Sequence, residues 1–261
     1  KTEGEERGTV EFRDVSFRYP GAAADELEHI SFKVRKGQTL AVIGATGSGK
    51  TTLASLIPRF YDATAGTVLV DGVDVRAYTF DALYNKLGYV TQKAVLFSGT
   101  VEDNVFFGQS AAEKTDASLQ AALSLSQAAE FVDKYPEKAA HPIAQLGRNV
   151  SGGQKQRLSI ARALARKPEI LIFDDSFSAL DYKTDAVLRE GLAKQLPGTT
   201  KIIVAQRIST IRNADQILVL DRGEIAGLGT HDELMVSCPV YREIAMSQLS
   251  EEELKKGGVS K

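Results

Sequence analysis

The residues with the clearest chemical pattern occupy positions 44–51, where the sequence reads GATGSGKT. An apolar run at 40–43 precedes them and a helix-forming run follows, so the pattern lies between a buried strand and a helix start. Glycines allow backbone angles closed to other residues, so consecutive N–H groups can turn inward around a phosphate. The positive end of the helix dipole adds to this attraction. The stretch therefore predicts a phosphate-binding P-loop.

Two side chains of this loop have defined tasks in such a site. Lys50 supplies a positive charge to the β- and γ-phosphates of a nucleotide, and Thr51 offers a hydroxyl to Mg²⁺. An ordinary Gly/Ser loop is the alternative, which the strand–loop–helix context disfavours. The nucleotide-binding residues predicted in this segment are Gly44, Thr46, Gly47, Ser48, Gly49, Lys50, Thr51 and Thr52.

A P-loop also needs a carboxylate that holds Mg²⁺ at the end of a neighbouring strand. Asp174 directly follows the apolar run 170–173. By itself, an aspartate after a strand is a common loop residue. Together with the P-loop it forms a Walker B arrangement, so Asp174 is predicted to be a metal ligand.

The composition limits the other possibilities. With 261 residues, of which 43% are hydrophobic, the chain can bury the core of one large domain or two small ones. Lys and Arg number 32 and Asp and Glu 34, and the net charge of -2 gives no support for a nucleic-acid partner. The single cysteine, Cys238, cannot form an internal disulfide, and His29, His141 and His231 are too scattered to suggest zinc.

The hydrophobic pattern predicts an α/β fold with a mostly parallel sheet. Apolar residues alternate in 10–19 and 30–34, which predicts antiparallel strands ahead of the P-loop strand. Continuous apolar runs at 170–173, 201–205 and 216–220 are separated by helix-length segments, as in a parallel sheet covered on both faces. Further strands are predicted at 67–70 and 87–91, and a T-x-x-E capping box at 230–233.

The predicted organisation is a linker at 1–8, one domain at 9–246 with a helical lobe at about 101–165, and a flexible tail at 247–261. No apolar run approaches the roughly 18 to 20 residues that cross a bilayer, so we expect a soluble fragment. The chain begins at Lys1 rather than with Met, which suggests a piece of something longer.

Residues 150–158, VSGGQKQRL, have the donor pattern of a second phosphate site. Ser151 and the amides of Gly152 and Gly153 open a helix and suit a γ-phosphate, although a plain glycine-rich helix cap is the alternative. The segment resembles the signature of the nucleotide-binding domains of ABC transporters, a P-loop NTPase fold with an N-terminal antiparallel subdomain and a helical signature subdomain. The likeness covers residues 10–246. It implies that Ser151 to Gln154 serve a nucleotide held by a second domain, so that two domains sandwich two ATP molecules head to tail.

Other positions match the family one at a time. Tyr19 resembles the aromatic residue that stacks on adenine, and Gln92 the Q-loop glutamine that reaches the metal and the attacking water. Residues 178–181 look like the D-loop that crosses the dimer interface, and 96–105 are similar to the exporter branch. The resemblance implies ATP and Mg²⁺ as cofactors, Thr51, Gln92 and Asp174 as metal ligands, a transmembrane domain fused upstream, and a place at the cytoplasmic face of the cell membrane.

Two departures from the family concern catalysis, for which the resemblance implicates Gln92, Asp175 and Gln206. Fully active members carry Glu after the Walker B Asp and His in the switch loop, where this chain has Asp175 and Gln206. Aspartate is one methylene shorter, which withdraws its carboxylate by about 1.5 Å. Glutamine cannot become a cation. Loss of a positioned base costs about 10²- to 10⁴-fold in rate, so binding should survive and turnover suffer. Gln145 stands near a position where exporters often have Glu.

These features favour a Mg-dependent ATPase domain of a heterodimeric exporter, with a weak site of its own and an intact signature for its partner. Three alternatives stay open: a homodimeric exporter with slow hydrolysis, a regulatory ATP-binding module without useful turnover, and an ABC ATPase that is not tied to membranes. The transported substrate is not encoded in this segment.

Overall fold

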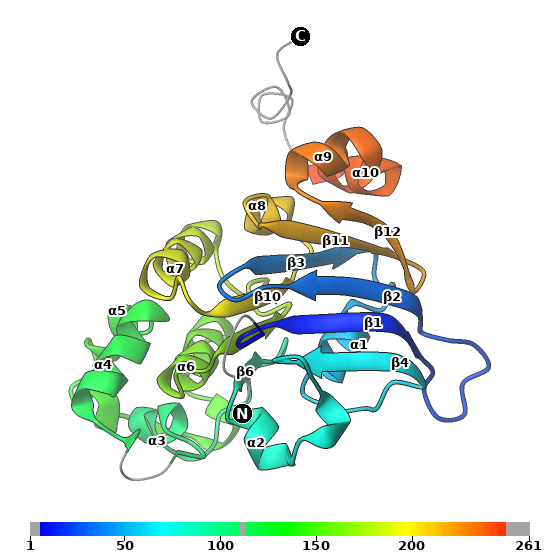
Figure 1. Cartoon of the computed structure of the whole chain (residues 1–261). Helices are drawn as coiled ribbons and strands as arrows, with labels where there is room; N and C mark the ends of the chain where they lie inside the picture. Colours follow the sequence, from blue (N-terminus) through cyan, green and yellow to red (C-terminus); the bar gives the residue numbers. More distant parts are fainter. Residues whose placement is uncertain (1–5, 110–112, 249–261) are drawn as a thin grey trace. The chain divides into compact units, whose positions relative to one another are not determined.

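The computed structural model of the chain describes residues 6–109 and 113–248. They belong to two compact units, the first made of residues 1–84 and 198–261 and the second of residues 85–197. Figure 1 labels the elements of each unit in chain order. Residues 1–5 of the predicted linker and 249–261 of the predicted tail lie outside the described residues.

The first unit contains an antiparallel sheet whose strand order is β2-β1-β4-β5. Its strands are β1 (Val10–Phe17), β2 (Leu27–Val34), β4 (Ala65–Val70) and β5 (Val73–Asp74). The alternation in β1 buries Val10, Phe12, Val15 and Phe17 on one face. The antiparallel strands predicted ahead of the P-loop strand are thereby confirmed.

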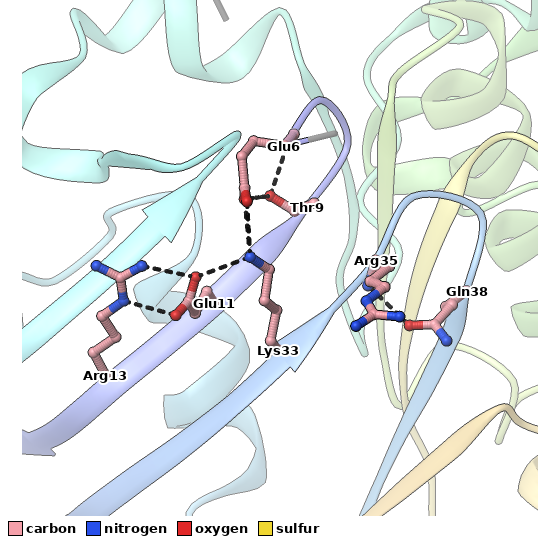
Figure 2. Close-up of polar contacts among 7 residues, drawn as sticks. All are labelled: Glu6, Thr9, Glu11, Arg13, Lys33, Arg35 and Gln38. Carbon is pink, nitrogen blue, oxygen red and sulfur yellow. Dashed lines mark hydrogen bonds and ion pairs between the residues drawn. The ribbon is translucent and has the colours of Figure 1, made fainter. Parts of the chain in front are cut away.

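The open face of this sheet carries a chain of ion pairs (Figure 2). Lys33 lies opposite Glu11 in the register and reaches both Glu11, at 3.4 Å, and Glu6, at 3.0 Å. Arg13 completes the row with a 2.7 Å contact to Glu11. Opposite charges on facing strands support this register.

Residues ahead of β1 are fastened to the unit by buried hydrogen bonds. The Gly8 amide donates to Oδ1 of the fully buried Asp71 at 2.6 Å, and the Thr200 hydroxyl donates to the Gly8 carbonyl at 2.5 Å. Asp71 follows β4 and Thr200 opens β10, so two different elements hold the start of β1.

A second sheet of the first unit has the order β12-β11-β3-β10. Its strands are β3 (Thr39–Gly44), β10 (Thr200–Val204), β11 (Gln216–Asp221) and β12 (Glu224–Gly229). β3 pairs in parallel with β10 and β11, whereas β12 runs antiparallel to β11. The parallel strands predicted at 201–205 and 216–220 are therefore confirmed, and their carboxyl ends share one edge with the end of β3.

Short helices complete the first unit: α1 (Lys50–Leu56), a 3-10 helix (Val75–Ala77), α2 (Phe80–Tyr84), α8 (Ile208–Ile211), α9 (His231–Ser237) and α10 (Pro239–Gln248). The predicted capping box is present at the start of α9, where Thr230 and Glu233 cap each other. α10 includes Ser247 and Gln248, two residues that the sequence assigned to the tail.

A buried hydrogen bond joins the two C-terminal helices, which lie side by side in Figure 1. Nδ1 of His231 and the hydroxyl of Tyr241 are 2.7 Å apart, and both side chains are buried. Burial, together with the positive charge of Arg212, lowers the pKa of His231. The folded chain therefore disfavours protonation of this imidazole.

The second unit has two parallel strands, β6 (Leu87–Val90) and β9 (Ile170–Asp174), and a small antiparallel pair, β7 (Gly99–Thr100) and β8 (Pro142–Ile143). Its helices are α3 (Val101–Val105), α4 (Asp116–Leu125), α5 (Ala129–Val132), α6 (Gly152–Ala165) and α7 (Tyr182–Gln195), with 3-10 turns at Lys138–Ala140 and Gln145–Gly147. α6 packs on α3, α4 and β6.

The longest helices, α6 and α7, have 14 residues each. Within the described part of the chain, none of the helices combines the length and the apolarity that a membrane span requires.

The lowered pKa of His231 predicts acid sensitivity of the fold. The unfolded chain, with an ordinary histidine pKa of about 6.5, binds the proton more readily than the folded chain. The contribution of His231 to the unfolding free energy is therefore full above that value and declines as the pH falls below it. Between about pH 7.5 and 5.5, urea unfolding should show a smaller loss of stability for His231→Gln than for the wild type.

His29→Gln is the control, because the pKa of His29 is shifted in the opposite direction to that of His231. The hydrogen bond and charge of Asp14, 2.7 Å away, raise the pKa of His29. The contribution of His29 is therefore present at low pH and lost as the pH rises through its folded pKa. If the unfolding free energy of the wild type and of His231→Gln changed equally with pH, the lowered pKa of the buried His231 would be contradicted.

Candidate functional site

The predicted P-loop connects the end of β3, at Gly44, to the start of α1, at Lys50. A Cβ on Gly44 would lie 2.3 Å from the carbonyl oxygen of Leu220, so only glycine fits beside β11. Gly49 has φ 103, a conformation that other residues rarely adopt. The Gly223 amide donates to the Ser48 carbonyl at 3.1 Å and ties the loop to the β11–β12 turn. The loop conformation therefore depends on the neighbouring strands.

The donors of this loop fit a phosphate. The N-cap residue of α1, Gly49, provides no side-chain cap, which leaves the first amides of the helix suited to an external acceptor. The Ser48 hydroxyl is buried and has no hydrogen-bond partner within residues 6–109 and 113–248. The Lys50 ammonium donates to the carbonyls of Gly44 and Ala45, at 2.7 and 2.9 Å, so its charge lies directly over the loop.

Tyr19 lies just beyond β1 and is attached to the P-loop helix. Its hydroxyl and that of Thr52 are 2.7 Å apart. The rings of Phe17 and Tyr61 meet Tyr19 edge-on, with centroids 4.8 and 5.2 Å away. Within the first unit, the structure thus brings together Tyr19 and Thr52, two of the residues predicted to bind the nucleotide.

Gln206 lies two residues beyond the end of β10, after Ala205, and is exposed. Val204 pairs with Val42, and the Ala205 amide donates to the Val42 carbonyl at 3.1 Å. Gln206 therefore lies at the sheet edge where β3 opens into the P-loop.

Parallel pairing also gathers the predicted residues of the second unit. Val90 of β6 pairs with Phe173 of β9, so Gln92 and the two aspartates follow neighbouring strand ends. Gln92 Nε2 donates to Asp175 Oδ2 at 3.0 Å. Asp175 is only 7% exposed and has φ 49, in the left-handed region that Asp tolerates better than most residues. Its carboxylate is therefore held by Gln92.

Asp174, which is 5% exposed, accepts a hydrogen bond from the Tyr89 hydroxyl at 3.2 Å. Burial and the charge of Asp174 raise the pKa of Tyr89, so the hydroxyl keeps the proton that it donates. Tyr89 was not among the residues predicted for the site. The one signal that the sequence offered is a polar-tipped residue inside the otherwise apolar strand β6.

The predicted signature residues begin α6. The Ser151 hydroxyl accepts from the Gln154 amide at 3.2 Å, and the Gln154 side chain accepts from the Ser151 amide at 2.9 Å. A Cβ on Gly152 would meet no atom within 4 Å, and one on Gly153 only the Ala179 carbonyl, at 3.4 Å. Nothing within the described chain therefore requires glycine at position 152.

A second residue that sequence reasoning missed connects this helix to the Q-loop. Gln156 is 1% exposed, and its Nε2 donates to the Thr91 carbonyl at 3.2 Å. The backbone next to Gln92 is thus attached to the signature helix. Position 156 carries a polar residue on the buried face of a helix, which was the available signal.

The oxygen donors fit Mg²⁺ better than a softer metal. The residues predicted to hold the metal, Thr51, Asp174 and Gln92, carry a hydroxyl, a carboxylate and an amide oxygen, the ligand types that Mg²⁺ prefers. Among the described residues, no group of three or more His, Cys, Asp or Glu side chains could hold a metal ion.

The sequence and the fold are both similar to those of ABC transporter proteins. The sequence pattern of the ABC transporter family matches residues 27–178. An uncharacterized ABC transporter ATP-binding protein of Mycobacterium tuberculosis is 48% identical over 242 residues, 92% of this chain and 41% of that protein. An ATP-dependent lipid A-core flippase of Aromatoleum aromaticum is 42% identical over 245 residues, 94% of this chain and 41% of that protein.

Among solved structures, the chain is similar to a bacterial Atm1-family ABC exporter with ATP bound, with a TM-score of 0.88 and 37% identity. The match covers 93% of this chain and 42% of the exporter chain. The chain thus spans about two fifths of the length of the relatives that it matches.

The surroundings of Gly152 predict that its substitution is harmless to the fold. Gly152→Ala adds a methyl group in open space at a helix start, so the midpoint of thermal unfolding should stay the same or rise slightly. Gly88→Ala is the contrast, because its Cβ would lie 2.8 Å from Leu171 and 2.9 Å from Pro168. An equal loss of stability in both variants would mean that Gly152 is packed inside the chain.

Proposed function

The chain belongs to the ABC transporter family as one of its ATP-binding domains, and we propose that it powers one subunit of a heterodimeric exporter. The export role is supported by similarity to a flippase and to an Atm1-family exporter. One observation supports the heterodimer: the positions proposed to be catalytic hold Asp175 and Gln206, whereas the exposed start of the signature helix keeps Gly152, which the described fold does not require.

We assign the following residues to the nucleotide and the metal. The P-loop amides, the Ser48 hydroxyl and Lys50 bind the triphosphate of ATP, and the Tyr19 ring stacks on adenine. Mg²⁺ is held by Thr51, Gln92 and Asp174, the last of which Tyr89 orients through its hydroxyl. Bound MgATP supplies a phosphoryl group whose transfer to water releases the free energy for transport.

The site that contains this P-loop is proposed to be weak. The Asp175 carboxylate is shorter than that of Glu by one methylene, about 1.5 Å, and it already accepts a hydrogen bond from Gln92. It is therefore poorly placed to take a proton from an attacking water. Gln206 can donate a hydrogen bond to a γ-phosphate but cannot become a cation. The expected cost is about 10²- to 10⁴-fold in rate, with little effect on ATP affinity.

The signature residues are proposed to complete the ATP site of a partner domain. The amides of Gly152 and Gly153 open a 14-residue helix whose N-terminus is exposed. Since a Cβ at Gly152 would meet nothing inside the chain, close approach of an external phosphate is a sufficient reason for glycine there. The two domains would then bind two ATP molecules head to tail.

The remaining partner is proposed to be a transmembrane domain, fused upstream in the longer protein. The chain would then act at the cytoplasmic face of the cell membrane. Changes at the membrane domain would reach the catalytic centre through Gln92, whose backbone neighbour Thr91 is bonded to Gln156 of the signature helix. The substrate would be selected by the membrane domain.

Repair of the altered catalytic positions tests the weak site. Asp175→Glu combined with Gln206→His should raise turnover at this site about 10²-fold. The measurement is ATP hydrolysis by the assembled pair, with the partner's own catalytic carboxylate replaced by an amide so that this site alone contributes. Unchanged turnover would contradict the proposal. Brisk hydrolysis by the wild-type chain alone, with two equal sites, would instead favour the slow homodimeric exporter.

Substitution of the signature residues tests the service to the partner. Gly152→Ala and Ser151→Ala should each lower ATP turnover of the assembled pair about 10²-fold and leave ATP affinity of this chain's own P-loop unchanged. Thr115→Ala is the matched control for Ser151→Ala, because it removes a capping box from α4 in the same unit, at a similar cost of about 1 kcal/mol. Equal losses in the two cap variants would reduce the signature to a structural cap.

A further inference from the structure

The last residue of α10 contacts the switch loop directly. The Gln248 side-chain amide makes two hydrogen bonds there: Oε1 accepts from the Ile208 amide at 2.9 Å, and Nε2 donates to the Gln206 carbonyl at 2.7 Å. The two bonded backbone groups lie on either side of Arg207. A single side chain, 40 residues away in sequence, therefore clasps the backbone that carries Gln206.

The clasp satisfies a group that local structure leaves open. α8 begins at Ile208, and its N-cap residue, Arg207, provides no side-chain cap. The Ile208 amide is one of the donors that a helix start cannot bond internally. Gln248 supplies the acceptor from another helix and, through Nε2, also fixes the orientation of the preceding Gln206 carbonyl.

The helix that carries Gln248 is itself firmly anchored. Tyr241 and Ala245, which precede Gln248 on α10, are fully buried. Tyr241 is bonded to the buried His231 at 2.7 Å, and α10 packs on α9, α8 and β11. The position of Gln248 is therefore set by the core of the first unit rather than by a flexible end.

We propose that Gln248 is a positioning residue for Gln206, and that α10 controls the switch loop through this side chain. The inference rests on the proposed function, because it assumes that Gln206 contacts the γ-phosphate of the ATP bound by this chain. Held by two hydrogen bonds, the backbone at 206 presents the Gln206 side chain in one orientation. In the wild type these bonds order the loop before ATP binds. When they are absent, ATP binding must order the loop, and the lost entropy weakens the binding of ATP.

This role predicts a nucleotide-specific effect. ADP lacks the γ-phosphate, so loss of the clasp should weaken the binding of ATP and spare that of ADP. Because the net contribution of one hydrogen bond is small, losing the orientation of Gln206 should lower the ratio of ATP affinity to ADP affinity about three- to tenfold. A purely structural role for Gln248 would lower both affinities, or only the melting temperature.

The experiment measures the ATP and ADP affinities of the full chain, with Mg²⁺ present, for Gln248→Ala, Gln206→Ala and the double variant. Each single substitution should lower the affinity ratio about three- to tenfold, and the double variant should lose no more than either single one. Gln195→Ala, at the exposed last residue of α7, is the matched control and should leave the ratio unchanged. Hydrogen exchange at the Ile208 amide should be faster in Gln248→Ala than in the wild type.

These measurements distinguish the positioning role of Gln248 from the contact of Gln206 with the γ-phosphate. If Gln206→Ala lowers the ratio and Gln248→Ala does not, the positioning role is overturned while the proposed function stands. Equal losses of ATP and ADP affinity in Gln248→Ala, or unchanged exchange at Ile208, also overturn it. If Gln206→Ala leaves the ratio unchanged, the assumed contact of Gln206 with the γ-phosphate fails and the inference fails with it.

Discussion

The pairing of parallel strands is the constraint on which the rest of the molecule depends. Because β3 is in register with β10 and β11, the P-loop and Gln206 emerge at one edge of the first unit. The pairing of β6 with β9 does the same for Gln92 and Asp175 in the second unit. Residues far apart in sequence become chemical neighbours because parallel strands end together. Within each unit, a register shift in the parallel pair would move apart residues that now follow neighbouring strand ends.

This geometry explains why local patterns in the sequence can predict where most of the candidate site residues lie. The P-loop, Asp174 and Ser151 each follow a strand or open a helix, and such positions can be recognised from a few neighbouring residues. The strands were predictable for the same reason, since burial dictates their periodicity. Tyr89 and Gln156 were missed, because each acts through one long-range side-chain contact that leaves no periodic trace.

Gln248 illustrates the limit more sharply. Its neighbourhood in the sequence is polar and charged, which predicts a tail, yet Gln248 is the last residue of α10. The buried faces of Tyr241 and Ala245 sustain the helix to that point. At position 175, which was predicted to be catalytic, the structure adds the hydrogen bond from Gln92 to Asp175, another long-range contact that local sequence does not reveal.

The attachment of Gly8 has a mechanical consequence. Its amide and carbonyl are bonded to Asp71, after β4, and to Thr200, at the first residue of β10. A pulling force applied to the backbone at Gly8 would thus be transmitted to both sheets of this unit. One of the two recipients, β10, leads straight to Gln206. Force applied at Gly8 would therefore be passed directly to the strand that precedes Gln206.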